Sequence, residues 1–92
     1  MQLNRDDLIE AFRRMSVIRE FEDRIHVLNE KGVLPGFIHL SAGQEASAVA
    51  ICMHLSDSDW IASTHRGHGH SLAKGCDVIG MMDEIYAKST GL

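Results

Sequence analysis

Proline, cysteine and clusters of positive charge are scarce in this 92-residue chain, and each scarcity excludes a class of protein. One proline beside eight glycines, with 45% hydrophobic and 24% charged residues, is untypical of a disordered or low-complexity chain. The formal net charge is −4 and no basic tract occurs, so the charge pattern offers nothing that attracts nucleic acid or an anionic membrane. We expect a soluble globular protein.

Long apolar runs are also missing. No run approaches the roughly 20 apolar residues of a membrane span, and the opening residues include Asp6 and Asp7, where a secretory signal needs apolar side chains. We therefore expect a cytoplasmic protein. Cys52 and Cys76 lie far apart and form no paired-ligand motif, so both are expected to be reduced, with Cys52 as a small buried hydrophobe.

An apolar stripe with gaps of three and four residues predicts a long amphipathic helix at the start of the chain. Asn4 is the expected N-cap of this helix and Gly32 its expected stop. The opposite face is charged and is expected to be solvated. The stripe consists of Leu8, Phe12, Met15, Ile18, Phe21, Ile25 and Leu28.

Two further helices are expected. The segment 32–40 contains Gly, Pro and Gly, so it leaves the first helix and carries His39 in a non-helical stretch. Ser41 is the expected cap of a second helix with residues 46–55 as its interior, in a pattern close to a capping box. Asp77 is the expected N-cap of the third helix, and Gly91 is its expected end. The residues expected to face inward are Val78, Met81, Met82, Ile85 and Tyr86.

Residues 60–63, with the sequence WIAS, have the character of a short buried strand. They lead into a loop over residues 64–71 that holds two glycines and three histidines. Because a lone strand leaves its backbone groups unpaired, we expect its partner strands in more chain or in another protein. The expected fold class is therefore α/β, with three helices and one short strand in a single partial domain over residues 1–92.

The glycine-rich loop suggests a phosphate site around Arg66. Gly67 and Gly69 leave room for backbone N–H groups and a guanidinium to converge on one anion. Arginine suits a diphosphate because its planar donors meet two oxygens at once. The alternative is a glycine-rich turn with an exposed arginine.

The histidines of the same loop allow two chemical interpretations. His65, His68 and His70 could hold zinc, with Asp57 or Asp59 as a fourth ligand, although cysteine ligands and second-shell partners are missing. Alternatively, histidines beside a phosphate site transfer protons around a bound cofactor or substrate, because imidazole titrates near neutral pH. For His26 and His54, on helical stretches, we expect a structural or surface role.

Three segments together resemble the alpha subunit of the thiamine-diphosphate-dependent 2-oxo-acid and acetoin dehydrogenases. They are MSVIREFE at residues 15–22, GFIHLSAGQEA at 36–46 and STHRGHGHSLAKG at 63–75. The resemblance covers essentially the whole chain in order and without a gap. It implies that these residues form the N-terminal, mostly helical part of a thiamine-diphosphate-binding α/β fold.

The resemblance also implies roles for single residues. His39 would lie close to the thiazolium and the substrate, as a cofactor-binding and catalytic residue, and His68 is a second catalytic candidate. His65 and Arg66 would contact the cofactor, with Arg66 on its diphosphate. Pyruvate and branched-chain members usually carry Tyr where this chain has His65, so the local sequence looks most like the acetoin-cleaving branch. No metal ligand is expected among these residues.

The reaction implied by the resemblance is oxidative transfer of an acyl group to a lipoyl group on a partner acyltransferase. A beta subunit in an alpha2beta2 assembly would supply the glutamate that activates the cofactor. The Mg²⁺–diphosphate motif of the family lies beyond this length, so we expect a truncated subunit that is inactive alone and binds the cofactor weakly. A histidine-rich metal-binding module and a non-catalytic interaction fragment are the alternatives.

Overall fold

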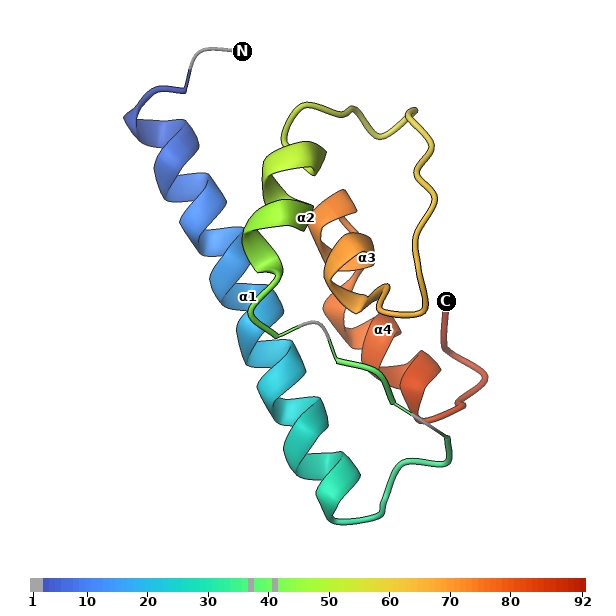
Figure 1. The fold of residues 1–92 in the computed structure, drawn as a ribbon. Helices are drawn as coiled ribbons and strands as arrows, with labels where there is room; N and C mark the ends of the chain where they lie inside the picture. Colours follow the sequence, from blue (N-terminus) through green and yellow to red (C-terminus); the bar gives the residue numbers. More distant parts are fainter. Residues whose placement is uncertain (1–2, 37, 41) are drawn as a thin grey trace.

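Two of the other helices pack on the leading helix α1 (Arg5–Glu30) (Figure 1). The computed structural model describes residues 3–36, 38–40 and 42–92. Asn4 caps α1 as predicted: its side chain accepts from the Asp7 N–H at 2.9 Å, and the Asp7 carboxylate accepts from the Asn4 N–H at 3.1 Å. The helix ends just before Gly32, whose φ of 71° confirms the predicted stop.

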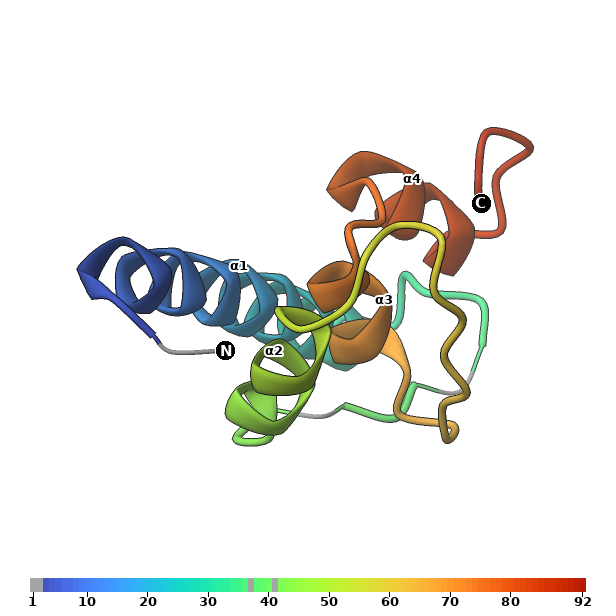
Figure 2. The ribbon, with the colours of Figure 1, turned by 90° about the horizontal axis from the view of Figure 1, so that it is seen from above.

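Helices α2 (Glu45–Cys52) and α3 (His68–Lys74) pack against each other and against α1, as both views show (Figures 1 and 2). Cys52 is a buried small hydrophobe, as predicted. Gln44 stands at the N-cap of α2, while the predicted cap, Ser41, lies outside the described residues. The core where the helices meet consists of Ile18, Phe21, Ile25, Ala48, Val49, Cys52, Leu72, Ala73 and Met81.

Helix α4 (Val78–Ile85) confirms one predicted cap and corrects a predicted end. The Asp77 side chain accepts from the Gly80 N–H at 2.8 Å, which is the expected N-cap bond. The helix stops at Ile85, well before Gly91. Gly91 has a different function, because a Cβ there would lie 2.8 Å from the Glu84 Cα. Its missing side chain lets the chain fold back closely onto α4.

The predicted strand is wrong for the described residues, where all regular structure is helical. Residues 60–63 run without a ladder, and Trp60 is 95% exposed. A strand needs a hydrogen-bonded neighbour, and no described segment supplies one. The helical part of the expected α/β fold is therefore present, without the strand.

Helix α3 was not predicted: it begins within residues 64–71, where the sequence predicted a loop. The Ser71 N–H donates to the Gly67 carbonyl at 2.9 Å, and Gly75 closes the helix with a φ of 111°. Leu72 and Ala73 are buried against the core. Their burial outweighs the low helix propensity of the glycine in the first turn. None of the described helices, including the 26-residue α1, is apolar enough over a sufficient length to cross a bilayer.

Candidate functional site

His39 and His65 lie in contact, although the sequence separates them widely. Their ring centroids are 4.8 Å apart and the ring planes meet at 88°, an edge-to-face arrangement. His39 comes from the connection between α1 and α2, and His65 from the connection between α2 and α3 (Figures 1 and 2). Both side chains are exposed to solvent. The structure therefore brings together two residues that the sequence predicted to contact the cofactor.

Arg66 follows directly and is also exposed. Its backbone N–H donates to the Thr64 hydroxyl at 3.3 Å, which fixes the turn before α3. Among the described residues, no carboxylate lies within ion-pair distance of its guanidinium. A cation that is exposed and without an acidic partner is available to a bound anion, as the predicted contact with a diphosphate requires.

His68, the first residue of α3, is placed differently from the other two. Its side chain is only 19% exposed, and its Nδ1 lies 3.2 Å from the Glu22 Oε1 on α1. Its ring also meets the edge of Phe21, with centroids 5.9 Å apart. Glu22 is fully buried. The imidazole of His68 is therefore engaged with α1, whereas His65 and His39 face solvent.

The histidines of the predicted zinc site have separate partners. His65 contacts His39, His68 pairs with Glu22, and the His70 Nδ1 forms a hydrogen bond with the Ser63 hydroxyl. Hydrogen bonds from Ser56 hold the Asp59 carboxylate and lower its pKa. In the part of the chain that the structure describes, no three His, Cys, Asp or Glu side chains gather as a metal site. The metal-binding alternative therefore has no ligand set here.

A second polar contact joins α1 to the start of α2. The Arg19 guanidinium donates to the carboxylate of Glu45, whose side chain is 5% exposed. Burial opposes ionisation of Glu45 and is the largest single effect. The hydrogen bond and positive charge of Arg19, together with backbone hydrogen bonds from Glu45 itself and Gly43, outweigh it, so the pKa of Glu45 is lowered. Helix α1 thus contacts the start of α3 through its own Glu22 and the start of α2 through the carboxylate of Glu45.

Sequence reasoning did not assign a function to Glu22 or Arg19. A signal for Glu22 was present, because residue 22 falls within the apolar stripe between Ile18 and Ile25. A charged residue on the buried face of a helix requires a polar partner. For the other two histidines the surface prediction is confirmed: His26 Nε2 lies 3.1 Å from Glu30, and His54 Nδ1 lies 2.8 Å from the Ala50 carbonyl oxygen.

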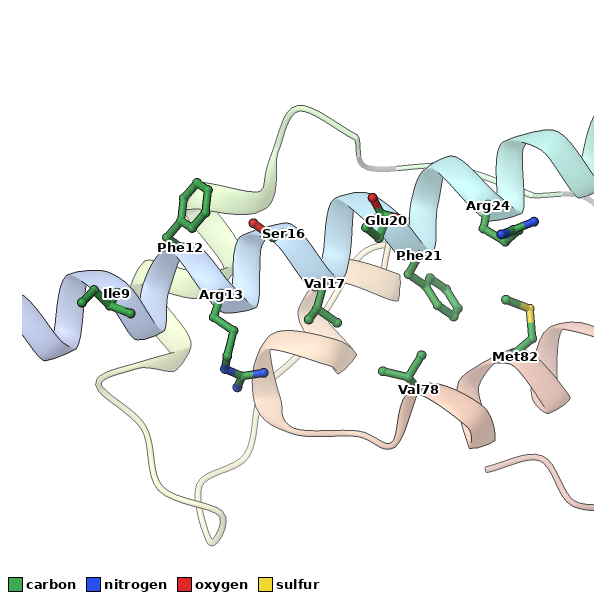
Figure 3. Close-up of a pocket in the computed structure, with 10 residues that line it drawn as sticks. All are labelled: Ile9, Phe12, Arg13, Ser16, Val17, Glu20, Phe21, Arg24, Val78 and Met82. Carbon is green, nitrogen blue, oxygen red and sulfur yellow. The ribbon is translucent and has the colours of Figure 1, made fainter.

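A cavity of about 670 Å³ forms an open groove between α1 and α4, away from the histidines. Figure 3 shows Val78 and Met82 of α4 facing α1 across it. The groove is mainly apolar, and none of the predicted site residues lines it. Its exposed Ile9 and Phe12 agree with the interaction alternative, which requires apolar surface on the helices.

Sequence comparison identifies the family of the chain. The chain belongs to the dehydrogenase E1 component family, whose sequence model matches residues 13–92. It is 55% identical over its whole length to the alpha subunit of acetoin:2,6-dichlorophenolindophenol oxidoreductase from Bacillus subtilis. The subunit of the same name from Cupriavidus necator is 53% identical over 99% of the chain.

More distant relatives carry a different name. The pyruvate dehydrogenase E1 component subunit alpha of Rhizobium meliloti is 36% identical over 99% of the chain and is itself covered to 26%. The chain spans 28% of the Bacillus subtilis subunit and 27% of the Cupriavidus necator subunit. No solved structure gives a significant match.

Proposed function

We propose that this chain is part of the alpha subunit of a thiamine-diphosphate-dependent dehydrogenase that oxidatively cleaves acetoin and passes the acyl group to lipoamide. The main structural support for this proposal is the contact of His39 with His65, next to an exposed Arg66. These are the residues to which the family resemblance gives cofactor contacts. Decarboxylation of a 2-oxo acid such as pyruvate is the second substrate class, which the more distant relatives support.

The side chains present fit such a cofactor. Arg66 would hold the diphosphate, since an exposed guanidinium donates to two phosphate oxygens at once. When bound, the cofactor supplies the nucleophilic carbon and stores the electron pair released from the substrate. His39 would lie beside the thiazolium and the substrate, where an exposed imidazole can give or take a proton near neutral pH. His65 would orient His39 through the ring contact.

The acetoin branch is the preferred substrate assignment. Relatives named for acetoin reach 55% and 53% identity, whereas those named for pyruvate reach 36% and 40%. His65 supports the same choice, since the pyruvate members usually carry Tyr at this position. The imidazole brings two ring nitrogens to this position, where a phenol brings one hydroxyl group.

The remaining components of the proposed enzyme lie outside these residues. The relatives are named as alpha subunits, which supports a beta subunit as partner. The family resemblance adds an alpha2beta2 assembly and a lipoyl-bearing acyltransferase as acceptor of the acyl group to the proposal. Magnesium would bind with the diphosphate through ligands beyond this segment. Residues 1–92 would form part of one cytoplasmic cofactor-binding domain, inactive on its own.

Calorimetric titration of the assembled dehydrogenase with thiamine diphosphate and Mg²⁺ tests this function. Arg66→Gln removes the guanidinium and is expected to weaken binding by roughly tenfold or more, the value of a charge-assisted contact. Arg5→Gln, on an exposed turn of α1, is the matched control and is expected to bind normally. Unchanged affinity in the Arg66→Gln variant overturns the assignment.

A further inference from the structure

Helix α1 carries two polar side chains that reach the two histidine segments. Arg19 and Glu22 lie one turn apart, so they project from the same side of the helix. Glu22 contacts His68 at the start of α3, and Arg19 contacts Glu45 at the start of α2. One helix therefore touches the first residue of each of the two helices that follow the histidine segments.

The contact between Glu22 and His68 lies very close to the site. Only Gly67 separates His68 from Arg66, and His65 comes directly before. The connection before α3 is otherwise exposed, and the Arg66 N–H bond to Thr64 is local. The Ser63 hydroxyl also bonds the His70 Nδ1 on α3, so the segment is attached on both sides of His65. The contact of His68 with Glu22 is the attachment that reaches α1.

Stability alone does not account for Glu22 at this position. A fully buried carboxylate loses its hydration, and its partner returns this loss only in part. An apolar side chain of similar size in the core is often neutral or more stable than a buried ion pair. The contact does, however, hold the imidazole of His68 against α1, because its Nδ1 lies 3.2 Å from the Glu22 Oε1 and its ring meets the edge of Phe21.

We propose that Glu22 is a positioning residue that acts through His68 to hold His65 and Arg66 beside His39. His68 is then a positioning residue as well, instead of the catalytic residue predicted from the sequence. Its ring contacts Phe21 and its Nδ1 lies 3.2 Å from the Glu22 Oε1, so the side chain packs against α1 and is largely withdrawn from solvent. The cofactor-related part of this inference rests on the proposed function; the geometric part does not.

The geometric part is tested by NMR on this chain without any ligand. In the wild type we expect a proton–proton cross-relaxation signal between the rings of His39 and His65, whose centroids are 4.8 Å apart. Glu22→Gln keeps the shape of the side chain but removes its charge. We expect it to shift the ¹⁵N resonance of His68 Nδ1 and to remove or weaken the signal between the two rings.

The functional part is tested by titrating the assembled dehydrogenase with thiamine diphosphate. Misplacement of His65 and Arg66 by Glu22→Gln is expected to raise the dissociation constant by roughly tenfold, since small displacements of binding groups have effects of this size. Glu20→Gln is the matched control, because Glu20 is an exposed acid on the same helix. It is expected to leave both the ring signal and the affinity unchanged.

The outcomes separate the two proposals. A wild-type enzyme that does not bind thiamine diphosphate overturns the proposed function, while the ring signal still decides whether Glu22 positions His65. An intact ring signal and normal affinity in folded Glu22→Gln overturn the positioning function. If Glu22→Gln does not fold, His68→Gln removes the same contact by substituting its less buried partner. Failure of both variants to fold shows that the pair is structural, and this also overturns the inference.

Discussion

The rings of His39 and His65 meet edge to face with their centroids 4.8 Å apart, although they come from connections on opposite sides of α2 in the sequence. The start of α2 is attached to α1 through Glu45, and the start of α3 is attached to α1 through His68. Helix α1, which carries neither imidazole, thus contacts the first residue of the helix that follows each of them.

His65→Tyr tests the substrate assignment. A phenol ring can replace the imidazole in the edge-to-face contact with His39, so thiamine diphosphate is expected to bind with nearly unchanged affinity. The ring nitrogens beside His39 are lost, which weakens the proposed orientation of His39 for proton transfer. We expect kcat/KM for acetoin to fall by roughly a hundredfold, the lower end of the value of general acid–base catalysis. Steady-state kinetics with acetoin and pyruvate measure this. An unchanged preference for acetoin contradicts a function of His65 in substrate choice.

The ion pair between Arg19 and Glu45 predicts a stability loss in acid. The pKa of Glu45 is lowered in the folded chain, so its contribution to stability is present above the unfolded value and is lost as the pH falls through the lower, folded value. Arg19→Gln is expected to cost about 1 kcal/mol at neutral pH, a modest value because the Arg19 side chain is half exposed. Urea unfolding of both proteins between neutral pH and pH 3 measures it. A variant with the same acid dependence as the wild type argues against this pair.

Asp77→Ala removes the N-cap bond of α4. The Gly80 N–H then loses its carboxylate acceptor, and we expect a loss of about 1 kcal/mol in the free energy of unfolding. For a domain of this size the melting temperature is expected to fall by about 4–8 °C. Asp57→Ala, in an exposed turn, is the control and is expected to melt like the wild type. Calorimetry on the chain measures the difference, and equal melting temperatures count against the cap.

Gly75→Ala isolates backbone strain at the end of α3. Gly75 has a φ of 111°, while no atom lies within 4 Å of a Cβ placed there, so the substitution introduces strain without a clash. We expect a loss of about 1 kcal/mol. Gly36→Ala is the matched control, because its surroundings are equally open and its φ is not positive. Thermal unfolding compares the two, and equal effects would falsify the strain argument.

Local signals explain why α1 could be predicted with both of its ends. The capping box of Asn4 and Asp7 and the positive φ of Gly32 depend on residues close in sequence. Helix α3 could not be predicted in this way, since the burial of Leu72 and Ala73 depends on helices α1 and α2. Its glycine and histidine residues have weak helix propensity by themselves.

The candidate site was predicted in part. The sequence identified His39, His65 and Arg66 through a family resemblance, and no spacing rule indicated that the first two are in contact. Glu22 was missed, because a helical pattern shows which face is buried but not which polar partner meets it there. Glu22 and His68 come from distant parts of the chain, and only the packed helices bring them together.

The exposure of Trp60 has an optical consequence. It is the only tryptophan of the chain and 95% of its surface is exposed, so the ultraviolet emission of the isolated chain comes from a hydrated indole and has a long wavelength. Any strand or subunit that covers residues 60–63 removes that water and moves the emission to the blue. The chain thus carries its own fluorophore in the segment that lacks a partner, and association can be followed without a label.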